Sequence, residues 1–364
     1  MFYHIFIGTK AQYIKTAPLI RLFDQNKINY RLIDSGQHGK LSINLRKELN
    51  IRHPDVQLGQ NHDLDSLGKI SIWTLRIVYQ VIFHRQRLST FLFADKKGYC
   101  ILHGDTPTTL ISFLLCKLYG HPVIHIEAGL RSFNIFHPFP EELIRLIVMR
   151  WADVLFAPSE SHQIQARKLN RKAKIFNVRM NSSYDEMCWA LQNHPNLKLP
   201  DSSYGVITIH RFETIFSRKK LSFIIQLVRN ITLDRHLVFV LHPPTILRLK
   251  KNHLYSELEA MPNLTIIQLL SHRDFVHLLK HAEFLITDGG SIQEEAYYLN
   301  IPTIIMRKKT ERSEGLGKNA ILCGFDSHII DSFFSNLKKY KHADIIKNYS
   351  PSQEMFNIIT QMPK

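Results

Sequence analysis

Short apolar runs alternate with longer segments of helical periodicity along the whole chain. Runs of this length that are rich in Ile, Leu, Val and Phe are typical of buried strands. The predicted strands are 2–7, 30–33, 99–102, 123–126, 154–157, 206–209, 237–241, 264–267, 284–286 and 303–306. Because helical segments separate the strands, the pattern predicts an α/β protein with two Rossmann-like, doubly wound parallel sheets.

The length of 364 residues indicates about two domains. A polar stretch rich in Asn and Pro, residues 181–203, separates the two series of strands. We therefore expect an N-terminal domain at 1–180 and a C-terminal domain at 181–345. One long helix, 67–83, is predicted within the first domain, in a region to which we assign no chemistry.

Unusual polar residues follow several of the predicted strands. Lys10, Asp105, Glu127 and His210 each come shortly after a strand, and so does the Gly289-Gly290-Ser291 turn. In doubly wound sheets, ligands bind beyond the carboxyl ends of the strands. These positions therefore predict ligand-binding sites.

The segment Ile286–Ala296 predicts an anion site. Gly289 and Gly290 permit a tight turn, and Ser291 with Glu294 matches the capping box that opens a helix. The start of a helix offers unpaired N–H groups and a positive dipole end, which suit a phosphate. The alternative is an ordinary turn between a strand and a helix.

Three carboxylates are candidates for acid–base chemistry: Asp105, Glu127 and Glu141. His210 could carry a proton or donate to a phosphate. Four basic side chains could neutralise a diphosphate: Lys10, Lys15, Arg145 and Arg312. Considered singly, each of these residues could equally be a helix cap, an ion-pair partner or a surface charge.

A helix is predicted to begin at Pro140, because proline suits the first helical position and the acids Glu141 and Glu142 suit the first turn. Arg145 is one turn away from both acids and can pair with them. The apolar residues expected to mark the buried side of this helix are Leu143, Leu146, Ile147 and Trp151.

The net charge of +16 favours anionic partners, although no dense block of Lys and Arg indicates nucleic-acid binding. Four separated cysteines without a C-x-x-C pair indicate reduced thiols in a cytoplasmic protein, with neither a metal site nor a disulfide framework.

The most apolar segment, 70–83, is too short to span a bilayer, so no integral membrane segment is expected. G-x-G-x-x-G and P-loop motifs are absent from the sequence, which disfavours a bound dinucleotide.

Several motifs occur together in one order: His103-Gly104-Asp105-Thr106, Glu127–Arg131, Pro138–Glu142, His210-Arg211, Thr287–Ala296, and Met306-Arg307 with Thr310–Arg312. With them, the chain from Gly8 to about Asp326 resembles the non-hydrolysing UDP-N-acetylglucosamine 2-epimerases. The resemblance implies a glycosyltransferase-B-like fold, a UDP-binding second domain, and a C-terminal helix within 346–364 that crosses back to the first domain. It implies no cofactor, and we expect a homodimer.

The resemblance also implies roles for individual residues. The implied catalytic group is Asp105, Glu127, Glu141 and His210. The implied contacts to the UDP-sugar are Lys15, Phe275, Gly289, Gly290, Ser291, Glu295 and Arg312, with Arg145 near the diphosphate. The chain departs from the family pattern where Lys10 replaces an arginine, Gln12 replaces a glutamate, and Gly289-Gly290-Ser291 replaces Ser-Gly-Gly.

The expected reaction interconverts UDP-N-acetylglucosamine and UDP-N-acetylmannosamine by elimination and re-addition of UDP through 2-acetamidoglucal. Its expected role is to supply precursors of a surface polysaccharide. Three alternatives stay open: a hydrolysing epimerase that releases N-acetylmannosamine and UDP, a glycosyltransferase of the same fold, and a non-catalytic UDP-sugar sensor.

Overall fold

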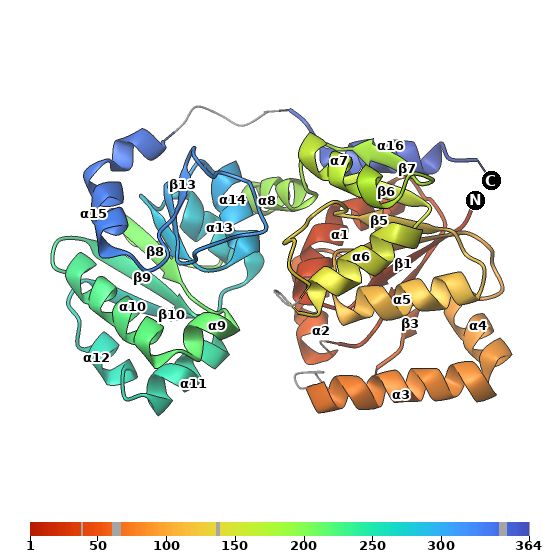
Figure 1. Cartoon of the computed structure of the whole chain (residues 1–364), viewed down its shortest axis with the longest axis horizontal. Helices are drawn as coiled ribbons and strands as arrows, with labels where there is room; N and C mark the ends of the chain where they lie inside the picture. The colour runs from red at the N-terminus through yellow and green to blue at the C-terminus, as the bar shows by residue number, and fades with distance from the viewer. Residues whose placement is uncertain (38, 60–66, 136–138, 342–347, 364) are drawn as a thin grey trace. The chain divides into compact units, whose positions relative to one another are not determined.

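A computed structural model shows two parallel α/β sheets, each within its own compact unit (Figure 1). The structure describes residues 1–37, 39–59, 67–135, 139–341 and 348–363. Unit 1 comprises Met1–Glu186 and Ser350–Lys364, and unit 2 comprises Met187–Tyr349. The domain boundaries expected from the sequence, 180/181 and 345/346, stay predictions. Pro138 and residues 346, 347 and 364 of the predicted C-terminal segment lie outside the described residues.

Unit 1 contains a seven-stranded parallel sheet in the order β3-β2-β1-β4-β5-β6-β7. Its strands are β1 (Tyr3–Ile7), β2 (Tyr30–Asp34), β3 (Val56–Gln57), β4 (Tyr99–His103), β5 (Val123–Ile126), β6 (Val154–Ala157) and β7 (Lys174–Asn177). Its helices are α1 (Lys10–Gln25), α2 (Gly39–Glu48), α3 (Leu67–Phe83), α4 (Arg85–Phe93), α5 (Pro107–Leu118), α6 (Glu141–Trp151), α7 (Glu160–Leu169) and α16 (Pro351–Thr360). Helix α8 (Ser183–Gln192) runs from unit 1 into unit 2.

Unit 2 contains a six-stranded parallel sheet in the order β10-β9-β8-β11-β12-β13. Its strands are β8 (Tyr204–Thr208), β9 (His236–Leu241), β10 (Leu264–Gln268), β11 (Leu285–Thr287), β12 (Thr303–Ile305) and β13 (Ala320–Leu322). Its helices are α9 (Phe212–Ile215), α10 (Arg218–Ile231), α11 (Pro243–Lys251), α12 (Tyr255–Glu259), α13 (His272–Lys280), α14 (Gly290–Tyr298), α15 (Ser327–Ser335) and the 3₁₀ helix η1 (Leu337–Tyr340).

Both sheets bury apolar residues on both faces. In β1, Ile5 and Ile7 belong to one hydrophobic core and Phe6 belongs to another. In β8, Ile207 belongs to one hydrophobic core and its neighbour Val206 belongs to another. Since successive side chains of a strand point to opposite faces, helices must cover each sheet on both sides. The predicted pair of doubly wound parallel sheets is confirmed.

Helix α16 packs on unit 1. Ser350 caps the helix by accepting from the backbone N–H of Gln353, and Pro351 occupies the first turn. The ring of Phe356 contacts Phe23 of α1 with centroids 5.5 Å apart, and Tyr3 Oη donates to the Ile359 carbonyl at 3.1 Å. The last helix therefore completes the core beneath α1.

Helix α6 differs from its prediction. Pro140 is the N-cap residue and the helix begins at Glu141, one residue later than expected. The predicted apolar side is wrong, because Leu143 and Trp151 are exposed. The buried residues are Glu142, Ile144, Arg145, Val148 and Met149. A hydrophobic pattern could not reveal this face, because two of its five members are charged residues held in ion pairs.

No helix within the described residues combines the length and the apolarity that a bilayer crossing requires.

Candidate functional site

Glu127 lies directly after β5 in a left-handed backbone conformation, with φ of 67°. Its Oε1 accepts from Lys15 Nζ and from Asn181 Nδ2, and its Oε2 lies 3.8 Å from His103 Nδ1. The side chain is only 9% exposed. A positive φ is uncommon for a residue other than glycine and is found preferentially at functional positions. The fold thus fixes this carboxylate between a cation, an amide and an imidazole.

Asp105 follows β4, the strand next to β5, and pairs with Arg145 of α6. Arg145 Nε and Nη2 lie 2.6 and 2.5 Å from Asp105 Oδ2. Arg145 also contacts Glu142, with Nη1 3.4 Å from Oε2, as its helical spacing predicted. Glu142 in turn accepts from Arg131 Nε at 2.5 Å. Burial opposes ionisation of Glu142, but Arg131, the Ser132 N–H and Arg145 together outweigh burial and lower the pKa of this carboxyl.

Glu141 is the first residue of α6 and lies next to the fully buried Glu142. Its Oε2 atom is buried, and no donor among the described residues reaches it. A buried carboxylate oxygen without a donor is costly, and such atoms call for an explanation such as a functional role.

His125 of β5 is buried and was not identified from the sequence. Its Nε2 lies 2.8 Å from the Gly104 carbonyl. Burial lowers the pKa of His125, and the charges of Asp105, Glu127 and Arg145 act on it as smaller influences. A neutral imidazole donating to Gly104 ties β5 to the turn that carries Asp105.

Gln12 of α1 is also buried and forms a capping box with Thr9. Its Oε1 accepts from the Thr9 N–H at 3.1 Å. Its Nε2 donates to the His103 carbonyl, Thr106 Oγ1 and Thr109 Oγ1 at 2.9–3.0 Å. The amide therefore joins α1 to the end of β4 and gives the His103 carbonyl a donor that an ionised carboxylate lacks. Lys10 is the first residue of α1 and is partly exposed.

We expect Gln12→Glu to lower the free energy of unfolding at neutral pH by about 1–3 kcal/mol, because an ionised carboxylate cannot donate to the buried His103 carbonyl. The deficit should shrink as the pH falls through the range where the carboxyl protonates. Chemical denaturation against pH measures both effects. Gln25→Glu, at the exposed end of the same helix, is the matched control and should change little; equal losses in both variants would contradict the role of Gln12.

In unit 2, helix α14 begins at Gly290, with Gly289 as its N-cap. The predicted capping box is wrong: Ser291 is exposed at the second helical position, so its hydroxyl is not at the cap. Glu294 instead pairs with Arg312, with Oε2 3.0 Å from Nη1, and accepts from Tyr298 Oη at 3.2 Å. The helix start after β11 nevertheless remains suited to an anion.

His210 is held beside this helix start. Asp288, which is fully buried, accepts the backbone N–H groups of His210 and Arg211, both at 3.0 Å. The His210 ring stacks on His242 with centroids 4.4 Å apart. A Cβ atom at Gly289 would lie 2.7 Å from His210 Cε1. The glycine therefore allows the imidazole to approach the turn.

We expect Gly289→Ala to lower turnover by on the order of 10²-fold, because the added methyl displaces the His210 ring. Steady-state kinetics would measure the loss, and circular dichroism would check the fold. Gly68→Ala is the control, since a Cβ there meets nothing within 4 Å. Unchanged turnover in the Gly289 variant would show that the position of His210 is unimportant.

Arg312 is buried beside the same helix start. A Cβ at Gly290 would lie 3.4 Å from Arg312 Nε and 3.3 Å from Glu311 Oε1. Glu311 pairs with Arg211 at 3.0 Å and with Arg307 at 3.1 Å. Burial opposes ionisation of Glu311, but these two arginines together lower its pKa to about 2. The loop after β12 thus brings Arg307, Glu311 and Arg312 to the region of α14, and Arg211, which follows β8, pairs with Glu311 there.

Two further predicted contacts lie on α13 and α14. Glu295 is buried and its Oε1 lies 2.9 Å from His272 Nε2. Phe275 is partly buried and packs against the adjoining core. Both residues therefore sit in well-packed surroundings.

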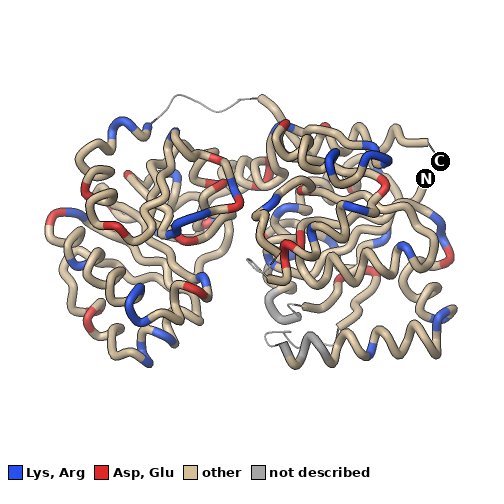
Figure 2. Tube along the Cα trace, in the orientation of Figure 1, with Lys and Arg blue, Asp and Glu red and all other residues tan. Residues whose placement is uncertain are grey.

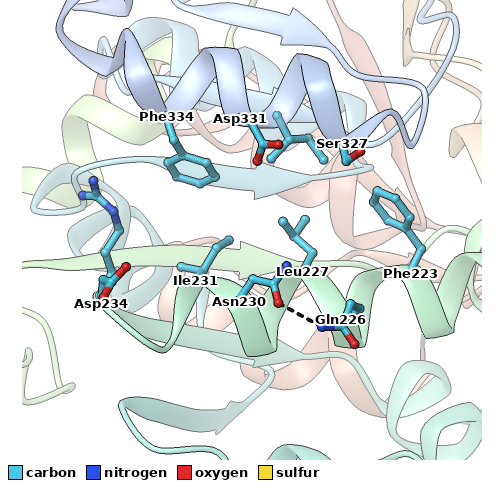
Figure 3. A pocket seen from close by; sticks show the side chains of 11 residues that line it. Phe223, Gln226, Leu227, Asn230, Ile231, Asp234, Ser327, Asp331 and Phe334 are labelled. Atoms are coloured by element: carbon cyan, nitrogen blue, oxygen red, sulfur yellow. Dashed lines mark hydrogen bonds between the residues drawn. The ribbon is translucent and has the colours of Figure 1, made fainter.

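Charges of both signs are interspersed over the two units (Figure 2). In the described part of the chain, no group of three or more His, Cys, Asp and Glu side chains is placed to hold a metal ion. A cavity of about 370 Å³ lies in unit 2 between α10 and α15, among residues such as Phe223, Ile231 and Phe334 (Figure 3). None of the predicted site residues lines it.

A family model described as UDP-N-acetylglucosamine 2-epimerase matches residues 21–357. The chain belongs to this family. Its members are isomerases, so the chain is an enzyme of that class. The UDP-N-acetylglucosamine 2-epimerase of Methanocaldococcus jannaschii is 30% identical over 330 residues, which cover 85% of this chain and 84% of the relative. That of Methanococcus maripaludis is 30% identical over 361 residues, covering 93% and 92%.

Solved epimerase structures have the same fold. The Methanocaldococcus jannaschii enzyme in complex with UDP-GlcNAc and UDP is 28% identical, with a TM-score of 0.83 and 99% of both chains covered. The Neisseria meningitidis enzyme bound to UDP-GlcNAc is 25% identical, with a TM-score of 0.82 and full coverage of both chains. The predicted glycosyltransferase-B-like fold and the family resemblance are confirmed.

Proposed function

We propose that this epimerase-family chain interconverts UDP-N-acetylglucosamine and UDP-N-acetylmannosamine by inverting C2 of the sugar. The observation that carries the proposal is the pair of carboxylates at the ends of neighbouring strands. Asp105 follows β4 and Glu127 follows β5, and each accepts from a buried basic side chain, Arg145 or Lys15. Relatives that bind UDP-GlcNAc in crystals support the choice of substrate.

The proposed chemistry needs a base and an acid near C2. A carboxylate takes the C2 proton, the C2–H electrons form the C1–C2 double bond, and the C1–O bond breaks with its electrons moving onto UDP. The intermediate is 2-acetamidoglucal. Re-addition of UDP at C1 with proton delivery to the other face of C2 completes the inversion. Asp105, Glu127 and Glu141 are the proposed proton carriers, and the Glu141 oxygen that lacks a donor among the described residues suits a proton acceptor.

Unit 2 supplies the groups proposed to stabilise the departing UDP. The start of α14 at Gly289, Gly290 and Ser291 offers backbone N–H groups, and Arg312 and His210 lie next to it. Preorganised donors of this kind lower the barrier where negative charge develops. The remaining proposed contacts to the UDP-sugar are Lys10, Lys15, Arg145, Phe275 and Glu295. No cofactor takes part in these steps.

We further propose that the chain acts as a cytoplasmic homodimer and supplies precursors of a surface polysaccharide. The non-hydrolysing outcome is part of the proposal. Incubation of purified protein with UDP-GlcNAc, followed by separation of products, tests it. Intact UDP-N-acetylmannosamine is the expected product. Free N-acetylmannosamine with UDP would indicate the hydrolysing alternative, and no turnover without an added sugar acceptor would favour a glycosyltransferase.

A further inference from the structure

Helices α9 and α11 of unit 2, which contact each other, leave three large apolar side chains in water (Figure 1). Phe212 begins α9 and is 68% exposed, Phe216 follows its last residue and is 46% exposed, and Leu247 of α11 is 69% exposed. The rings of Phe212 and Phe216 stack with centroids 3.8 Å apart. The Arg248 guanidinium lies 3.4 Å from the centroid of the Phe216 ring, so the stacked rings and the end of α11 that carries Leu247 form one surface.

The outward side of α11 combines apolar and basic residues. Its exposed members are Pro243, Pro244, Leu247, Lys250 and Lys251. At about 100° per residue these five fall within an arc of roughly 120°, whereas Thr245 and Leu249 are buried on the other side of the helix. Lysine side chains can lay their apolar stems along such a surface while the ammonium groups reach outward. This composition is typical of a helix that lies on a lipid surface.

Five basic side chains adjoin the exposed apolar residues: Arg218, Lys219, Arg248, Lys250 and Lys251. Arg218 and Lys219 stand in the first turn of α10, shortly after Phe216, where cations oppose the helix dipole. Within the described residues, none of the five cations forms an ion pair. We call Phe212, Phe216, Leu247 and these five cations the α9–α11 patch.

The acidic side chains near the α9–α11 patch are few, and two of the three are paired with other arginines. Glu213 of α9 has its Oε1 3.2 Å from Arg211 Nη1, and Glu257 of α12 has its Oε2 2.5 Å from Arg229 Nη2. The third, Glu259 of α12, is exposed. The patch therefore carries an excess of positive charge, which is complementary to an anionic partner.

The size of the patch distinguishes a lipid surface from a protein partner. Three apolar side chains at these exposures leave on the order of 300 Å² of apolar surface in water. A stable protein–protein interface buries about 800 Å² per partner, so the apolar part of the patch is too small for one. A shallow insertion at the boundary between headgroups and acyl chains needs less, because attraction of the basic residues to acidic lipids adds to it.

We propose that the α9–α11 patch docks unit 2 on the surface of an anionic lipid bilayer. Phe212, Phe216 and Leu247 enter the headgroup region, and the five cations face acidic headgroups. Docking of this kind involves none of the residues proposed to carry protons or to bind the UDP-sugar, and it needs no turnover.

Vesicle sedimentation with the full chain tests the docking. Wild-type protein should bind vesicles of phosphatidylglycerol and phosphatidylcholine in preference to pure phosphatidylcholine, and added salt should weaken the binding. Leu247→Glu should weaken it by roughly tenfold or more, because an inserted apolar side chain is replaced by a charge. Leu233→Glu is the matched control and should bind like wild type, since Leu233 is also 69% exposed but lies beyond the far end of α10.

Charge reversal tests the basic part of the patch. Lys250→Glu combined with Lys251→Glu should weaken binding by on the order of 25-fold or more, since each lysine near an anionic surface raises the affinity roughly fivefold. Lys338→Glu combined with Lys339→Glu makes the same change in net charge on η1 and should have a much smaller effect. Circular dichroism and turnover of UDP-GlcNAc without vesicles should match wild type in every variant, which separates docking from the proposed reaction.

A fluorescent label at position 247 tests whether the apolar side chain enters the lipid. In a Cys188→Ser background the remaining native cysteines are buried, so Leu247→Cys or Leu233→Cys can carry an environment-sensitive fluorophore. Anionic vesicles should shift the emission to the blue at 247 and leave it unchanged at 233.

Three results would overturn the proposal. The first is wild-type protein that stays unbound in the presence of anionic vesicles. The second is equal binding of the Leu247→Glu and Leu233→Glu variants, or of the two double lysine variants. The third is binding without an emission shift at 247, which would show only a general attraction of a chain with a net charge of +16 for anions.

Discussion

Glu127→Gln should lower the turnover of UDP-GlcNAc by on the order of 10²–10⁴-fold, the range in which a positioned proton carrier contributes. Glutamine nearly matches the shape of the carboxylate and still accepts from Lys15 and Asn181, but it cannot take a proton from C2. The affinity for UDP should change little, because the groups proposed to stabilise the departing UDP, at the start of α14 together with Arg312 and His210, lie on unit 2. Steady-state kinetics and UDP titration calorimetry measure the two quantities.

The same substitution removes the counter-charge of buried Lys15, so a loss of stability must be separated from a loss of chemistry. Glu186→Gln is the matched control, because Glu186 is fully buried in unit 1 and pairs with Arg21 at 2.6 Å. It should lower the unfolding midpoint while leaving kcat of the folded fraction intact. Comparable kcat values for the two variants would reject Glu127 as a proton carrier.

Arg312→Met should weaken UDP binding by about 10- to 150-fold, since a hydrogen bond to a charged group contributes about 1.5–3 kcal/mol. The residue is 7% exposed and lies beside the start of α14, where the diphosphate is proposed to bind. Titration calorimetry with UDP measures the effect without any need for turnover.

Removal of Arg312 alone leaves the buried Glu294 carboxylate without its cation. In comparable buried pairs, such a change lowers the free energy of unfolding by about 3–5 kcal/mol. The double variant Arg312→Met with Glu294→Gln relieves that cost and should bind UDP as weakly as the single variant. Arg229→Met is the control, because Arg229 forms an exposed pair with Glu257. Recovery of wild-type UDP affinity in the double variant would mean that Arg312 acts only through stability.

The alternation of strands and helices was sufficient to predict both sheets, and for some elements the predicted limits were also right. Helix α3 was predicted with its observed limits, and so were β5 and β6. The short strands β3, β7 and β13 were missed. Two or three residues of apolar sequence give no periodic signal, and β7 begins with the exposed Lys174. Such strands form because a neighbouring strand offers hydrogen bonds, which sequence alone does not show.

The positions of candidate residues after strands could be predicted because the carboxyl ends of parallel strands share one edge of a sheet. Their partners could not. Asn181, which donates to Glu127, lies in a polar stretch that the sequence indicated only as a boundary. His125 donates to the Gly104 carbonyl, and Asp288 accepts from the His210 N–H. In both cases the partner is a backbone group far away in the sequence. Glu294 was predicted to cap α14, whereas a long-range ion pair with Arg312 determines its position.

Reaction in heavy water tests the central claim most directly. Purified protein incubated with UDP-GlcNAc in D₂O, followed by NMR, should incorporate deuterium at C2 of the intact UDP-sugar, and Glu127→Gln should suppress this exchange. Formation of UDP-N-acetylmannosamine that keeps its original C2 hydrogen would contradict a mechanism in which carboxylates carry that proton.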